Sequence, residues 1–316
     1  MSAPAPTGAR ALHVLAPGPH AAVQDLGRPG RAALGVGASG AADRAALRRA
    51  NRLLGDPEGT AAVETTLGGL RVRAEGDLLV AVTGAPVPVM VSGRGSVRTA
   101  GTEEVLRLRA GEELALGTPT SGLRGYVAVR GGIAVPPVLG SRSTDVLAGL
   151  GPPLLAAGTV LPVGPAPAAP PVLDALPVPA PPAGDLVLRV VLGPRDDWFT
   201  PEAVRALLGA AWTVGPASDR VGMRLLGPAL ARTRAQELPS EGLVRGALQV
   251  AAGGAPTLML ADHPVTGGYP VIAVVLDADT DAAAQARPGQ RLRFTRAAGS
   301  SPARSAGTAR ASPTPR

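Results

Sequence analysis

The chain has 316 residues, a formal net charge of +7 and no cysteine, and 45% of its residues are hydrophobic. This length and hydrophobicity predict one large domain or two smaller ones with buried cores. The absence of cysteine excludes disulfides, thiolate metal sites and a cysteine nucleophile. All 31 basic residues are arginines, which excludes a Schiff-base lysine, a P-loop lysine and a biotinylated lysine in this chain.

The remaining composition argues against nucleic acid, membrane and metal centres. Only 2% of the residues are aromatic, too few for base-stacking platforms, and the positive charge is scattered rather than clustered. No run approaches the roughly 20 apolar residues of a membrane span, and the N-terminus lacks signal-peptide features. Only three histidines are present, at positions 13, 20 and 263, so a histidine-rich metal centre is implausible, although a single Asp/Glu/His site stays open. We therefore expect a cytoplasmic protein with no metal site.

The first half of the chain is expected to be rich in β-strands. A flexible N-terminus over residues 1–11 precedes an N-terminal subdomain over 12–163. The apolar spacing from Ala46 to Leu54 predicts a helix over 43–54, with Asp43 as its cap and Gly55 after its end. Short apolar runs separated by turn residues predict antiparallel strands, at 70–72, 78–82, 87–91, 105–108 and 123–129.

The second half follows a Pro/Ala-rich stretch, residues 164–184, which is typical of an extended linker or strap. Thr200 and Pro201 predict the start of a helix over 200–208. The other predicted elements are strands at 186–192, 243–250, 257–260, 269–276 and 289–294, and a short helix at 281–286. They define a C-terminal subdomain over 185–296, followed by a disordered tail over 297–316.

Two polar clusters with glycines stand out first. One comprises Gln24, Asp25 and Arg28, followed by Ser39 and Gly40. Its glycines let backbone amides approach a ligand, and Arg28 suits a carboxylate or phosphate, although Asp25 and Arg28 could simply pair locally. The second cluster is SDRVGMR over 218–224. Its two arginines, at positions 220 and 224, suit an anion clamp, although the second could equally be an exposed strand residue.

Two further clusters lie near the C-terminal end. Ser240 and Glu241 precede a predicted strand that ends near Gln249. The stretch ADHPVTGGYP, residues 261–270, follows an apolar run and so occupies a strand end, where functional loops often lie. In it Asp262 suits a general base, and the other candidates are a donor hydroxyl at Thr266 or Tyr269 and the amides of Gly267 and Gly268. His263 is either an acid–base group or a surface histidine.

Several of these motifs together resemble one family, and the match covers roughly residues 12–296 in order. They are VQDLGRPG, GASGAAD, AN at 50–51, Glu64, GPRDDWF, SDRVGMRL, SEG, GALQV and ADHPVTGGYP. The family is the biotin-dependent carboxyltransferase family, also called allophanate hydrolase subunit 2. His263 departs from it, since glutamine is expected there, which weakens a catalytic role for this histidine.

The resemblance implies a fold and a site. The fold is mainly β with a few short helices, in two β-rich subdomains, the C-terminal one a cyclophilin-like β-barrel. The site would lie between the two halves. Its catalytic residues would be Asp262 for proton transfer, Arg220 for anionic groups, Glu241 and Tyr269. Its substrate-binding residues would be Gln24, Asp25, Arg28, Arg224, Ser240, Gln249, Thr266, Gly267 and Gly268, the last two as oxyanion contacts.

The resemblance also implies an activity and partners. The chain would be the C-type subunit of an ATP-dependent 5-oxoprolinase, which opens 5-oxoproline to glutamate and is inactive without its partners. These would be a KipI-like B-type chain and a LamB/YcsF-like A-type chain, with ATP and magnesium held on or shared with a partner. One alternative is a carboxyltransferase that moves a carboxyl group from carboxybiotin on another protein to urea or a related amide. Another is a non-catalytic regulator that binds a KipI-type kinase inhibitor.

Overall fold

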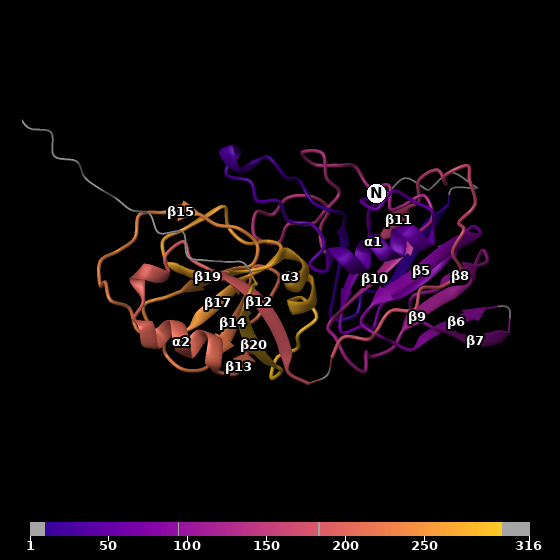
Figure 1. Cartoon of the computed structure of the whole chain (residues 1–316). Coiled ribbons are helices and arrows are strands. Elements are labelled where there is room, and N and C mark those ends of the chain that lie inside the picture. The colour runs from indigo at the N-terminus through magenta and orange to yellow at the C-terminus, as the bar shows by residue number, and fades with distance from the viewer. Residues whose placement is uncertain (1–9, 94, 183, 299–316) are drawn as a thin grey trace, which may run out of the picture.

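The computed structural model describes residues 10–93, 95–182 and 184–298. Two β-rich regions lie side by side, the first coloured indigo to magenta and the second orange to yellow (Figure 1). The predicted fold class, mainly β with a few short helices and a C-terminal barrel, is confirmed. Within these residues there are three α-helices, and none has the length and apolar character that a bilayer crossing needs.

Two antiparallel sheets form the first region. The six-stranded sheet has the order β11-β1-β4-β9-β6-β7 and consists of β1 (Ala11–Ala16), β4 (Arg71–Glu75), β6 (Val89–Gly93), β7 (Ser96–Ala100), β9 (Glu113–Leu116) and β11 (Val160–Pro162). The five-stranded sheet has the order β2-β3-β10-β5-β8 and consists of β2 (His20–Gln24), β3 (Ala62–Thr66), β5 (Leu78–Gly84), β8 (Val105–Leu108) and β10 (Arg124–Val129).

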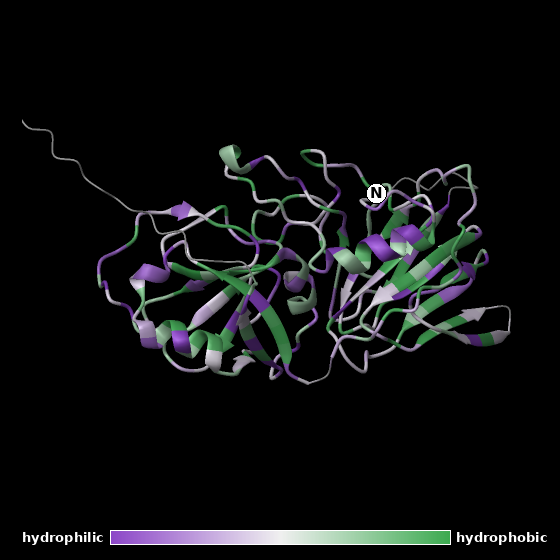
Figure 2. Cartoon of the chain, viewed as in Figure 1, coloured by the Kyte–Doolittle hydropathy of each residue, from purple (hydrophilic) through white to green (hydrophobic). Residues whose placement is uncertain are grey.

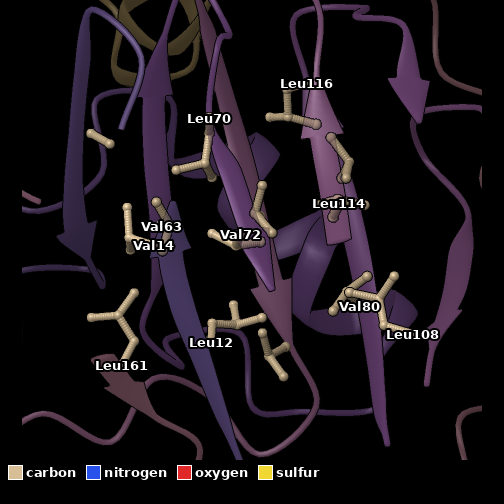
Figure 3. Packing of buried hydrophobic residues seen from close by; sticks show 14 of the residues in the cluster. Leu12, Val14, Val63, Leu70, Val72, Val80, Leu108, Leu114, Leu116 and Leu161 are labelled. Carbon is tan, nitrogen blue, oxygen red and sulfur yellow. The ribbon is translucent and has the colours of Figure 1, made fainter. Parts of the chain in front are cut away.

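The first hydrophobic core lies between these two sheets. Because side chains alternate between the faces of a strand, every second residue points inward. Leu12 and Val14 of β1 thus meet Val72 of β4, Val80 of β5 and Leu114 of β9, all completely buried (Figure 3). Strand β10 is buried along its whole length, which requires a second layer on its other face.

Helix α1 (Arg44–Leu53) supplies that second layer. The Asp43 carboxylate accepts a hydrogen bond from Ala46 N at 2.9 Å and caps the helix, as predicted. Apolar residues at helical spacing, among them Leu47 and Leu53, pack on Tyr126 and its neighbours in the sheet. The helix presents hydrophilic residues on its outer side and lies over largely hydrophobic strands (Figure 2).

The second region is a closed barrel with the strand order β12-β19-β16-β17-β14-β13-β20. Trp212 and Phe294 lie completely buried in its core. Helix α2 (Pro201–Gly209) begins as predicted, with the Thr200 side chain accepting from Ala203 N. The barrel strands are β12 (Leu186–Leu192), β13 (Trp212–Val214), β14 (Gly222–Leu226), β16 (Ala247–Val250), β17 (Pro256–Met259), β19 (Val271–Val275) and β20 (Arg291–Arg296).

Two predicted elements differ from the structure. Of the strand expected over 243–250, only residues 247–250 form one, β16, and a separate short strand, β15 (Glu241–Gly242), precedes the expected range. Strand β16 begins directly after Gly246, whose φ is +89° and where a Cβ would lie 2.6 Å from Val275 O, so only glycine fits. Helix α3 (Asp277–Ala283) begins four residues earlier than expected. Asp277 and Asp279 in its first turn favour that start, because carboxylates stabilise a helix N-terminus.

The Pro/Ala-rich stretch runs along the first region as a strap. Arg130 Nη2 donates to Pro167 O at 2.7 Å. Further along, Val105 N donates to Asp174 O and Leu176 N donates to Glu103 O, both at 2.8 Å. No helix or strand forms over the described residues 165–182. Nearly all of the predicted flexible ends, 1–11 and 297–316, lies outside the described residues.

Candidate functional site

Polar side chains line up across β2, β3 and β10 on the face that looks toward the barrel. The register pairs Thr66 with both His20 and Arg124, and it pairs Glu64 with Tyr126. Residues opposite each other in a sheet point to the same face, and so do residues two apart. The three strands therefore present one row of His20, Thr66 and Arg124 beside a second row that contains Glu64 and Tyr126.

The barrel brings Arg220 and Asp262 to the same place. Arg220 precedes β14 and Asp262 follows β17. These two strands are antiparallel, with Gly222 of β14 opposite Met259 of β17. The ladder continues past the strand ends, because Asp262 N donates to Arg220 O at 3.0 Å. Arg220 Nε and Nη2 then both bond the Asp262 carboxylate, each at 2.9 Å. This is the bidentate arrangement that suits the planar guanidinium.

A charged network joins the two regions through Arg220. Its Nη1 donates to Glu64 Oε1, and its Nη2 also donates to Gly40 O at 2.6 Å. Glu64 accepts further bonds from Tyr126 OH at 2.7 Å and from a backbone amide of the loop before α1. Asp262 accepts from Ser39 Oγ at 2.6 Å. The side chains of the central three, Arg220, Glu64 and Asp262, are at most 3% exposed.

The electrostatics of this network keep Glu64 and Arg220 ionised. Burial alone would raise the pKa of Glu64, but the charges of Arg220 and Arg124 and two hydrogen bonds lower it to about 2. Burial opposes the charge of Arg220 as well, yet the two carboxylates raise its pKa above the usual arginine value. The guanidinium thus binds carboxylates of the protein itself. The predicted roles of Arg220 on substrate anions and of Asp262 in proton transfer stay predictions.

A second set of contacts holds the barrel to α1. Gln285 Oε1 accepts from the backbone amides of Leu123 and Arg124, both at 2.9 Å. Its Nε2 donates to Asp43 Oδ2 at 2.7 Å. Asp281 of α3 accepts from the backbone amide of Arg44 in the first turn of α1, at 3.0 Å. Two separate sets of hydrogen bonds, one around Arg220 and one around Gln285 and Asp281, therefore hold the two regions together.

The predicted residues Gln24, Asp25 and Arg28 bind one segment, residues 138–150, rather than each other. Asp25 accepts from Ser141 Oγ and Arg142 N, both at 2.6 Å. Gln24 Nε2 donates to a carbonyl oxygen of the segment, Thr144 O, at 2.8 Å. Arg28 lies 3.8 Å from Asp145, so the local pair of Asp25 with Arg28 does not form. The segment in turn reaches the junction, where Val146 N donates to Asp262 at 3.2 Å.

Most of the other predicted residues lie on a small ribbon at the barrel's outer end. Strands β15 and β18 (Thr266–Gly267) pair there. Glu241 forms an ion pair with Arg195 and both are partly exposed, while Ser240, Thr266 and Gly268 are exposed. Tyr269 is 51% exposed, its ring lies 5.9 Å from Arg232, and its carbonyl oxygen accepts from Gln249 Nε2. Arg224 lies exposed on the outside of β14.

Two cavities flank the junction. The larger, of about 530 Å³, lies between the regions and is lined mostly by apolar side chains, with His20, Arg124 and Arg220 among its polar ones. The smaller, of about 380 Å³, is lined by Asp145, His263 and Thr266 together with loop residues 32–37. Burial lowers the pKa of both His20 and His263 below the usual histidine value.

Sequence patterns did not identify His20 and Arg124 as junction residues, and they left Ser39 and Glu64 without a role. Glu64 is the one charged residue of the largely buried strand β3, AVETT, so a charge inside a strand with β-branched neighbours was the available signal. The rows across β2, β3 and β10 depend on strand register, which one sequence does not reveal.

The described residues offer little to a metal or nucleotide. They contain no group of three or more His, Asp or Glu side chains placed to hold a metal ion. A triphosphate does not fit the larger cavity. Arg220 there is engaged by two carboxylates, Arg124 lies 4.0 Å from Glu64, and Asp219 at the rim adds negative charge.

Comparisons with known proteins give concordant results. The C subunit of 5-oxoprolinase from Escherichia coli is 37% identical over 286 residues, which cover 90% of each chain. The crystal structure of TTHA0988 superimposes with a TM-score of 0.82 at 35% identity; the match covers 92% of this chain but 56% of that one. K. lactis urea amidolyase superimposes with a TM-score of 0.84 at 31% identity, over 90% of this chain and 18% of that one.

The match to a family model is as extensive. The model for the carboxyltransferase domain, subdomain A and B, covers residues 34–296 and therefore both β-rich regions. It agrees with the resemblance that the sequence motifs indicated. The chain belongs to the carboxyltransferase domain family, subdomains A and B.

Proposed function

We propose that this chain is the C-type subunit of an ATP-dependent 5-oxoprolinase, which opens the lactam ring of 5-oxoproline to glutamate. The carrying observation is the extent of the match to the C subunit of the E. coli 5-oxoprolinase, which covers 90% of both chains. Urea amidolyase matches over the same part of this chain but is several times longer, and the chain covers only 18% of it. In extent, the match therefore favours the C subunit of 5-oxoprolinase over urea amidolyase.

Partner chains would complete the enzyme. The rim of the larger cavity exposes three large apolar side chains, Leu67 (38%), Val146 (39%) and Leu154 (48%). Exposed apolar side chains around one cavity suit coverage by another protein. Since a triphosphate does not fit that cavity, we assign ATP to a KipI-like B-type chain or a LamB/YcsF-like A-type chain.

The chemistry asks for few groups on this chain. Ring opening is a hydrolysis: a water oxygen adds to the carbonyl carbon, negative charge develops on the carbonyl oxygen, and the bond from that carbon to the ring nitrogen then breaks as the nitrogen takes up a proton. Hydrogen-bond donors fixed in a water-poor cavity stabilise such charge. The junction network supplies fixed walls, because Arg220 holds both regions together. Gly267 lies on the β15–β18 ribbon and Gly268 follows it, and neither lines this cavity, so the oxyanion contacts predicted for them stay a separate prediction.

A carboxyltransferase is the second candidate, and a specific observation favours it. The urea amidolyase domain shares the fold with a TM-score of 0.84. Because this chain contains no lysine, biotin would have to arrive on another protein. Carboxyl transfer to urea or a related amide would use the same cavity.

The test is reconstitution with A- and B-type partners and omission of each chain in turn. Glutamate and ADP are measured after addition of 5-oxoproline and ATP. We expect turnover only when all three chains are present. Turnover that persists without this chain, or a stable complex with no turnover, would contradict the proposal. In the second case, transfer from carboxybiotin to urea is measured next.

A further inference from the structure

The floor of the larger cavity carries two buried polar atoms that lack a partner among the described residues. They are His20 Nδ1 and Arg124 Nε. Both residues pair with Thr66 in the sheet register, one on each side of β3, and all three line the cavity. Arg124 is only 4% exposed. The two unpartnered atoms thus belong to one row of side chains that faces one cavity.

Such atoms call for an explanation. A buried donor or acceptor without a partner costs about 1–3 kcal/mol, and native proteins pair most of them. Arg220, Asp262 and Gln285 at the same junction each make several hydrogen bonds. Other buried side-chain atoms also lack a partner among the described residues, Arg44 Nε and Arg245 Nε at the junction included. Of the residues that carry such atoms, only His20 and Arg124 line the larger cavity, so these two are the ones that a ligand in the cavity reaches.

The two atoms differ in hydrogen-bonding character. Arg124 Nε–H can only donate. Burial lowers the pKa of His20, so the ring is neutral near pH 7 and one of its nitrogens accepts. The charges of Arg124 and Arg220 are matched by those of Glu64 and Asp262. The floor therefore offers one donor and one acceptor without excess charge, which suits a neutral group better than a second anion.

We propose that His20 and Arg124 recognise the amide edge of a small lactam. The ring forces the amide into the cis form, so its carbonyl oxygen and its N–H point to the same side. The oxygen would accept from Arg124 Nε–H, and the N–H would donate to His20 Nδ1. Apolar lining residues such as Leu123, Met223 and Leu260 would contact the ring methylenes. The inference rests on the proposed function, because 5-oxoproline is a lactam, and it makes both residues specificity-determining.

The carboxylate of 5-oxoproline would meet no favourable charge at the rim of this cavity. The exposed charged residue at the rim is Asp219, whose Oδ1 accepts from the backbone amides of Val221 and Gly222. A carboxylate placed there would meet like charge rather than a cation. We therefore expect 2-pyrrolidinone, the lactam without a carboxylate, to bind the free chain at least as well as 5-oxoproline does.

The experiment measures binding to the full chain by calorimetry. The probes are 5-oxoproline, 2-pyrrolidinone, proline, which lacks the carbonyl, and cyclopentanone, which lacks the N–H. We expect only the two lactams to bind. His20→Phe and Arg124→Met should each weaken lactam binding about tenfold, the effect of one lost hydrogen bond. Arg124→Lys keeps the charge beside Glu64 but moves the donor, so it should weaken binding even if the methionine variant does not fold.

Matched controls make the same changes elsewhere. His13→Phe and Arg71→Met alter strand residues of the other sheet, away from the cavity, and should leave binding unchanged. The reconstituted complex provides the second readout, in which His20→Phe and Arg124→Lys should raise KM more than they lower kcat.

The outcomes separate this inference from the proposed function. Turnover of 5-oxoproline with an unchanged KM in both variants would overturn the inference and leave the function standing. Lactam binding that depends on both residues without turnover would sustain the inference and reject the function. Equal binding of cyclopentanone and 2-pyrrolidinone would also overturn the inference, because the amide N–H would then contribute nothing.

Discussion

The junction and the β15–β18 ribbon contain similar sequence motifs but have opposite physical characters. At the junction Arg220 and its two carboxylates are almost completely buried, and each makes several hydrogen bonds across the boundary between the regions. On the ribbon Glu241 and Tyr269 are partly or largely exposed, each with a single arginine neighbour. A polar residue beside glycine therefore marks a structural tie in one place and an accessible surface in the other.

This difference assigns different tasks to the junction and the ribbon. A buried ion network fixes geometry, because removal of either partner leaves an uncompensated charge. Exposed side chains contribute little to stability but remain available to a substrate or a partner. Substitutions at the junction should therefore mainly lower stability, and substitutions on the ribbon should leave stability nearly unchanged.

The largest effect is expected from Arg220→Ala. The change leaves Glu64 and Asp262 buried without their cation, so the free energy of unfolding should fall by about 3–5 kcal/mol. Urea denaturation measures this. Arg224→Ala, an arginine four residues away on the exposed side of β14, is the matched control and should change stability by less than about 0.5 kcal/mol. Equal effects would show that the network does not hold the regions together.

The next effect is a loss of stability in acid that depends on Glu64. Its pKa falls from 4.5 in the unfolded chain to about 2 in the folded protein. A lowered folded-state pKa stabilises the protein above pH 4.5, and this stabilisation is lost as the pH falls toward 2. The shift corresponds to about 3 kcal/mol. Glu64→Gln should flatten the dependence of unfolding free energy on pH in this window. An unchanged pH profile would place the acid sensitivity elsewhere.

A smaller effect is expected from Gln285→Ala. The buried amide, two residues after the end of α3, joins the barrel region to Arg124 and to the α1 cap, Asp43. Its removal leaves buried backbone groups unpaired, at about 1–3 kcal/mol. The control is Gln290→Ala, an amide that donates to Pro182 O and Gly184 O in an exposed setting and accepts from Arg287 N. Thermal unfolding of the two variants measures the difference. A larger loss at position 290 would contradict this order.

The smallest effect on stability is expected at the ribbon. Glu241→Gln weakens a partly exposed ion pair with Arg195 and should cost at most about 1 kcal/mol. If the predicted catalytic role of Glu241 is correct, turnover of the reconstituted enzyme should nevertheless fall at least tenfold. Steady-state kinetics and urea denaturation on the same samples decide this. Unchanged turnover would remove the ribbon from the active site.

Local sequence patterns predicted the elements that depend on local chemistry. The Asp43 cap and apolar spacing located α1, and Thr200 with Pro201 located α2. The family resemblance, rather than the residues themselves, indicated the barrel. Local rules failed where a contact between residues distant in sequence sets the end of an element. At Gly246, for example, the carbonyl oxygen of Val275 leaves no room for a side chain.

The candidate site was predictable only in part for the same reason. The motifs indicated that Arg220 and Asp262 belong together, and the structure places them in contact. The rows that contain His20, Glu64 and Arg124 arise from the register of β2, β3 and β10, and β10 lies far from the other two in the chain. Burial of Arg220 between two carboxylates likewise depends on how the two regions meet, and no local pattern encodes that.

The central claim is that the junction, rather than the ribbon, receives the small amide. Amide hydrogen exchange of the full chain with and without 2-pyrrolidinone tests it directly. We predict slower exchange at residues 20–24 and 124–129 and in the loop over 218–222, with no change over 240–242 and 266–269. Slowing confined to those ribbon residues would contradict the account.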